Sequence, residues 1–127
     1  MIVDVPTSVG ELIDKITILE IKKENITDNV KQKNVRVELK LLKDKLKSLD
    51  IPDLLEHTLS LYYVNKSLWA IEDQIRNKEK HKQFDDEFVQ LARSVYYTND
   101  ERAQLKKQIN ILVGSTLIEE KQYDDYQ

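Results

Sequence analysis

Glycine and proline are almost absent from this chain of 127 residues, which contains two of each. Folds built from many strands need frequent turns, and these two residue types are the usual turn formers. Their scarcity therefore favours a few long helices. Pro6, Gly10, Pro52 and Gly114 also lie close to expected helix boundaries, so the helix interiors are uninterrupted. We expect an all-α fold.

The same scarcity excludes several classes of site. Gly10 and Gly114 stand alone at opposite ends of the chain, which rules out the dinucleotide-binding and P-loop phosphate motifs. The chain has no cysteine, so disulfides, thiolate zinc sites and cysteine nucleophiles are excluded. His57 and His81 lie far apart and outside any HExxH motif. We expect no metal and no cofactor.

Hydrophobic spacing and capping residues predict four helices arranged as two antiparallel hairpins in a helical, coiled-coil-like bundle. Ser8 and Glu11 form a capping-box pattern, Asp50 is the expected cap of the third helix, and Gly114 follows the fourth. The apolar residues of the first helix fall on two faces, which suggests burial on two sides. The predicted helices are 9–25, 29–49, 51–80 and 86–113.

We predict one domain over residues 1–127. It comprises an extended lead (1–7), a short hairpin (8–49), a long hairpin (50–114) and a tail (115–127). Ile2 to Val5 could form a short N-terminal strand, paired with Thr116 to Ile118.

Polar residues interrupt the apolar faces of the predicted helices. Projection of the third and fourth helices at about 100° per residue places these residues among the hydrophobic ones. Folding of the long hairpin should bring Asn65 level with Asn99 and Arg102. The first helix adds Glu20, which lies beside Ile13 and Ile16. The predicted seam consists of Glu20, Asn65, Glu72, Arg76, Asn99, Arg102 and Lys106.

The seam has two interpretations. In the first interpretation, the seam is a structural layer that fixes helix register. Its buried charges must then be paired with one another or reach solvent. Alternatively, Arg76, Arg102 and Lys106 bind a phosphate or carboxylate ligand, with Glu72 or Glu20 as an acid or base.

A second candidate anion site lies at the start of the first helix, where Thr7, Ser8 and Gly10 offer free N–H groups. The competing interpretation is a capping box that satisfies itself. Carboxylates also occur in three adjacent runs, Glu72-Asp73, Asp85-Asp86-Glu87 and Asp100-Glu101. Adjacent residues point to different sides of a helix, so these runs make poor metal cages.

Charge and hydropathy limit the partners. The formal net charge of −3 makes nucleic acid an unlikely partner, although Lys33, Arg36, Lys40, Lys43 and Lys47 form a basic stripe. No segment resembles a signal peptide or membrane span, so we expect a cytoplasmic location. The second helix also has an apolar stripe, formed by Val30, Val37 and Leu41, and we expect homo-oligomerisation or a protein partner to cover it. This stripe faces away from the coiled-coil-like face of the same helix, which consists of Val35, Leu39, Leu42, Leu46 and Leu49.

Four segments resemble an uncharacterised family of short bacterial and phage proteins. They are PTSVGELIDKITILEIK (6–22), VNKSLWAIEDQIR (64–76), FVQLARSVYYTNDERAQLKKQIN (88–110) and EEKQYDDY (119–126). The resemblance implies a compact α-helical protein, sometimes encoded near cell-surface polysaccharide genes. It implies no established activity and no catalytic residues.

The sequence thus favours a non-catalytic helical binding or assembly protein, oligomeric and linked to cell-surface polysaccharide metabolism. The alternative is a small all-α enzyme or ligand binder that acts on an anionic substrate at the seam. It is superficially similar to chorismate mutase, but the usual arginine of that fold's first helix has no counterpart, because the first arginine is Arg36.

Overall fold

The computed structural model describes residues 1–126 and contains four helices. They are α1 (Val9–Asn25), α2 (Asn29–Lys47), α3 (Leu55–Lys80) and α4 (Asp86–Val113). The all-α prediction is confirmed. That residues 1–127 form one domain stays a prediction, and its tail extends one residue beyond the described range.

Local caps explain the boundaries that the sequence predicts correctly. Ser8 Oγ accepts a hydrogen bond from the Glu11 backbone N–H at 3.1 Å, which starts α1. Asp85 accepts one from the Phe88 N–H at 2.9 Å and starts α4. Gly114 ends α4 with φ of 68°, the left-handed conformation that glycine adopts without strain.

The predicted start of α3 at Ile51, capped by Asp50, is wrong. The helix begins at Leu55, and Asp53 Oδ1 accepts the Leu55 N–H at 3.0 Å. Proline disfavours helical geometry in the residue before it, and Ile51 precedes Pro52. Ile51 and the buried Leu54 instead pack into the core as part of the connection. The second helix also ends two residues before its predicted end at Leu49.

The predicted N-terminal strand is also wrong, because neither Ile2–Val5 nor Thr116–Ile118 forms a strand in residues 1–126. An isolated two-stranded ladder is marginally stable in water. Ile2, Val3 and Val5 remain exposed.

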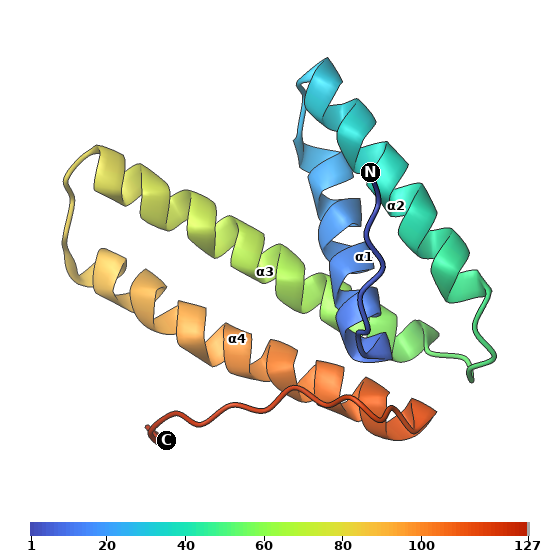
Figure 1. The fold of residues 1–127 in the computed structure, drawn as a ribbon. Coiled ribbons are helices and arrows are strands. Elements are labelled where there is room, and N and C mark those ends of the chain that lie inside the picture. The colour runs from blue at the N-terminus through green and yellow to red at the C-terminus, as the bar shows by residue number, and fades with distance from the viewer. Residues whose placement is uncertain (127) are drawn as a thin grey trace.

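The two helical hairpins meet at an angle (Figure 1). α1 is the shared element, since it contacts α2 on one side and both α3 and α4 on the other. The distal halves of α3 and α4 extend beyond this junction and pair with each other (Figure 1).

Burial of α1 on two sides produces two hydrophobic clusters. Leu12, Ile16 and Leu19 pack with Val35 and Leu39 of α2. The second cluster consists of Ile13, Leu54, Leu61 and Ile109, and it joins α1 to the long hairpin.

Candidate functional site

Asp14 of α1 lies at the centre of the polar contacts between the two hairpins. The residue is only 1% exposed. Its carboxylate accepts two hydrogen bonds from Arg102 of α4, one from Nε to Oδ1 at 2.9 Å and one from Nη2 to Oδ2. Asn65 of α3 donates a third bond from Nδ2 to Oδ1 at 2.8 Å. Side chains from α1, α3 and α4 therefore converge on one buried carboxylate.

These bonds compensate for burial of the charge. A buried carboxylate is costly unless it is paired and hydrogen-bonded, and a bidentate guanidinium is the strongest partner that a side chain offers. The hydrogen bonds to Asp14 raise the pKa of Arg102, despite partial burial of the guanidinium. Asn65 Nδ2 also lies 2.9 Å from Thr17 Oγ1, and the Thr17 hydroxyl donates to the Asp14 carbonyl at 2.7 Å.

Lys106, one helical turn after Arg102, has its own anionic partners. Its side chain is 8% exposed, and Nζ lies 2.7 Å from the carboxylates of both Glu11 and Glu119. Burial lowers the pKa of Lys106, but the hydrogen bonds to the two glutamates outweigh that effect, so the pKa is raised. The hydrogen bond from Lys106 correspondingly lowers the pKa of Glu119.

The start of α1 lies directly on α4. The Gly10 N–H donates to Asn110 Oδ1 at 2.7 Å. A Cβ atom at Gly10 would lie 2.5 Å from the Lys106 carbonyl oxygen, so only glycine permits this approach. Thr7 and Ser8 line a shallow groove of about 580 Å³, beside Glu11, Lys106 and Glu119. The Ser8 hydroxyl caps the helix by accepting the Glu11 N–H, whereas the Glu11 carboxylate binds Lys106.

The structure brings together part of the predicted seam. Asn65 and Arg102 share Asp14, Lys106 lies beside them, and Asn99 Oδ1 is 3.5 Å from Arg102 Nη1. Glu20 lies elsewhere and forms an ion pair with Lys43 of α2.

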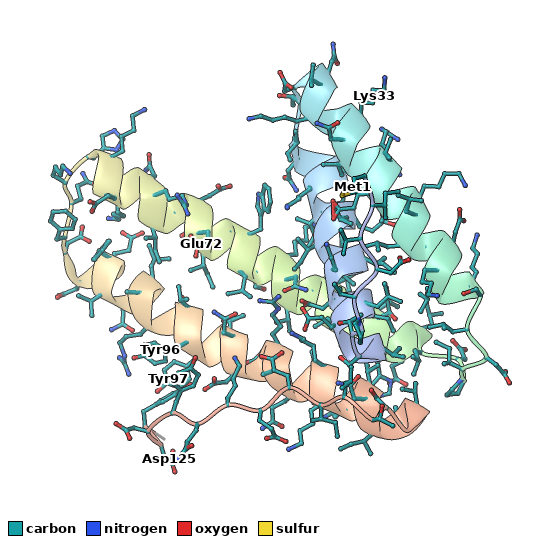
Figure 2. The ribbon with its side chains drawn as sticks, in the orientation of Figure 1. Met1, Lys33, Glu72, Tyr96, Tyr97 and Asp125 are labelled. Carbon is teal, nitrogen blue, oxygen red and sulfur yellow. The ribbon has the colours of Figure 1, made fainter. Side chains whose placement is uncertain are left out.

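Glu72 and Arg76 form the expected local pair on α3, with 3.3 Å between Oε2 and Nε. Both side chains are largely exposed, and Glu72 lies along the outer stretch of α3 (Figure 2). They form the rim of the polar contacts rather than part of the buried centre.

The central residue, Asp14, is missing from the predicted seam, as are its neighbours Thr17 and Asn110. A signal for Asp14 is present in the sequence. Gly10, Asp14, Thr17 and Ile21 follow spacings of four, three and four residues, which places them on one face of α1. All four are buried, whereas the prediction that α1 is buried on two sides considered only its apolar residues.

A second groove, of about 460 Å³, lies where α1 diverges from the long hairpin. α1 contributes Ile18 and Ile21, and α4 contributes Asn99 and Arg102. The α3 residues that line it are Asn65, Leu68, Trp69, Glu72, Asp73 and Arg76.

Residues 1–126 contain no cluster of three or more histidine, cysteine, aspartate or glutamate side chains suited to a metal ion. In that part of the chain, no helix has the length and apolar character needed to cross a bilayer.

Together these features define an all-α protein whose two helical hairpins are joined by a buried carboxylate–guanidinium centre. The chain belongs to a family of unknown function, DUF6165, whose family model matches residues 1–126. No curated protein and no solved structure shows significant similarity to the chain.

Proposed function

We propose that the chain is a non-catalytic helical binding or assembly protein that self-associates. The observation that carries this proposal is the neutralisation of the two cations that α4 places against α1. Arg102 is bound by Asp14, and Lys106 is bound by Glu11 and Glu119. The Asp14 centre therefore supports a structural role, in which it fixes α1 against α3 and α4.

The same pairing argues against an enzyme that acts on an anionic substrate there. A phosphate or carboxylate would have to displace carboxylates that the protein already supplies. Separation of a buried ion pair costs several kcal/mol, about 3 to 5 by analogy with pairs broken by mutation. Glu20, one of the two candidate acid or base residues, lies on the α2 side of α1, where it pairs with Lys43.

Self-association is supported by the outer face of α2. This helix packs chiefly against α1, through Val35 and Leu39. On the opposite face Val30, Val37 and Leu41 are 71%, 55% and 49% exposed. A second copy of the chain is the simplest cover for such an apolar stripe.

The proposal also includes a role in cell-surface polysaccharide metabolism and a cytoplasmic location. A link to cell-surface polysaccharide metabolism is supported by the resemblance of segments 6–22, 64–76, 88–110 and 119–126 to the family. The cytoplasmic location is supported by the hydropathy of the chain.

The test is the solution mass of the protein by light scattering at micromolar concentration. We expect more than one copy per particle, and Val37→Lys should shift the particles towards monomer. Val89→Lys is a matched control, because Val89 of α4 has similar exposure (48%) and lies outside the stripe. A monomeric wild-type mass, or an equal effect of the two substitutions, would contradict self-association through α2.

A further inference from the structure

The groove between α1 and the long hairpin has the size and lining of a small-molecule site. Its volume of about 460 Å³ lies within the range of roughly 300 to 1,000 Å³ typical of ligand pockets. Ile18, Leu68 and Trp69 provide apolar wall, and polar side chains from α3 and α4 complete the lining.

Asn65 places an unused acceptor in this groove. The residue is 5% exposed, and its Nδ2 atom donates to Asp14 and Thr17. Since a carboxylate can only accept, the amide nitrogen must face Asp14 and Oδ1 must point away from it. Within residues 1–126, no group donates a hydrogen bond to Asn65 Oδ1, and this oxygen atom is accessible to solvent. It is therefore open to a hydroxyl or amide donor.

Arg102 supplies donors beside this acceptor. Nε and Nη2 are occupied by Asp14, whereas Nη1 has only a long contact of 3.5 Å with Asn99. The guanidinium thus retains N–H groups, and its side chain is 28% exposed and lines the groove.

The charges disfavour a phosphate in the same place. Asp14 neutralises Arg102 and Glu72 pairs with Arg76, which leaves the carboxylate of Asp73 in excess. A ligand that suits this groove must carry both donors and acceptors, have little net charge, and have an apolar surface for the indole of Trp69.

We propose that this groove binds a neutral polyhydroxylated ligand, with one sugar ring against Trp69 and its hydroxyls bonded to Asn65 and Arg102. Each hydroxyl both donates and accepts, so a sugar satisfies Asn65 Oδ1 and Arg102 Nη1 together. An organic cation would match Trp69 and Asp73 but would leave the Arg102 donors unpaired. The inference deepens the binding part of the proposed function and rests on it, whereas self-association is measured separately by mass.

Trp69 is the sole tryptophan of the chain, so its fluorescence reports directly on the groove. The probes are D-glucose, D-galactose and N-acetylglucosamine, with glucose 6-phosphate and tetramethylammonium as representatives of the competing chemistries. We expect a saturable emission change with at least one neutral sugar and a higher Kd for glucose 6-phosphate than for glucose. The side-chain amide signals of Asn65 and Asn99 should move in the NMR spectrum over the same concentrations.

Three variants, compared by NMR titration, locate the binding. Trp69→Leu should raise the Kd about tenfold, whereas Trp69→Phe retains a ring and should raise it less. Tyr63→Leu removes an exposed aromatic ring from α3 outside the groove and should leave the Kd unchanged. The proposal is overturned if no neutral sugar gives a saturable change, if glucose 6-phosphate or tetramethylammonium binds more tightly, or if Tyr63→Leu weakens binding as much as Trp69→Leu does.

Discussion

Arg102 forms a bidentate pair with Asp14, a residue 88 positions earlier in the chain. The pair joins α4 to α1, and thereby joins the long hairpin to the short one. Asn65 adds α3 to the same carboxylate. The contact fixes both the distance between α1 and α4 and the rotation of α1 about its own axis, because the planar guanidinium must bond to both carboxylate oxygens.

The substitution Gly10→Ala tests the close approach of α1 to α4, because the sign of the change in the free energy of unfolding depends on that approach. Helix propensity alone predicts that alanine stabilises the helix by about 1 kcal/mol. We expect the opposite, a loss of about 2 kcal/mol in the free energy of unfolding, because the new Cβ would meet the Lys106 carbonyl oxygen and Asn110 Oδ1. Urea denaturation measures the difference.

The comparison for this prediction is Gly114→Ala, whose added Cβ meets no atom within 4 Å. It should lose only about 1 kcal/mol, through strain at a positive φ. An increase in stability for Gly10→Ala would show that α1 does not lie this close to α4.

The contact between Glu119 and Lys106 should depend on pH. Its hydrogen bond with Lys106 lowers the pKa of Glu119 below the ordinary value of 4.5. A carboxyl group whose pKa is lowered on folding contributes stability above its unfolded pKa, and that contribution is lost as the pH falls through the folded value. The first part of the tail should therefore leave α4 in acid.

NMR titration of the Glu119 carboxyl carbon measures this effect. Lys106→Met should move its pKa upward, towards the ordinary value. Lys107→Met removes a neighbouring exposed lysine and should change it little. If the two variants gave the same titration curve, the Lys106 contact would not account for the lowered pKa.

Tyr126 anchors the far end of the tail. Its ring packs edge-on against Tyr96 and Tyr97 at centroid distances of 4.9 and 5.0 Å, and its hydroxyl donates to Asp100. Tyr96 and Tyr97 lie on α4 where the end of the tail, marked by Asp125, returns to it (Figure 2). Tyr126→Ala should expose the tail and speed tryptic cleavage after Lys121.

Tyr123 is the matched control for this experiment, because it is a tail tyrosine that is 80% exposed. Tyr123→Ala should leave the cleavage rate near that of the wild type. Equal rates for Tyr126→Ala and the wild type would show that the tyrosine cluster does not restrain the tail.

The sequence was most informative where a boundary depends on a local contact. Ser8, Asp85 and Gly114 act on backbone groups within a few residues, and the limits of α1 and α4 follow from them. The start of α3 depends only in part on such contacts, namely the effect of Pro52 on Ile51 and the bond from the Leu55 N–H to Asp53. Leu54 also packs with Ile13 and Ile109, which come from distant parts of the chain, and that packing could not be predicted.

In the polar centre, too, some residues could be predicted from the sequence and others depend on packing between distant segments. Asn65 and Arg102 stand out because they interrupt apolar faces of long, regular helices, and antiparallel pairing predicts their proximity. Asp14 does not stand out, because it lies between the two apolar faces of α1 and its burial becomes evident only when α3 and α4 cover that side. Glu20 lies beside Ile16 on α1, and that side of the helix packs against α2, where Glu20 pairs with Lys43.

The central claim is that Asp14 and Arg102 form a structural ion pair, and a double-mutant cycle of urea denaturation tests it most directly. Arg102→Met should lose about 3 kcal/mol in the wild-type background, because it leaves the Asp14 charge buried without its guanidinium. In the Asp14→Asn background the same substitution should lose about 1 to 3 kcal/mol less. Losses that agree within about 0.5 kcal/mol in the two backgrounds would mean that the residues act independently, and would contradict the claim.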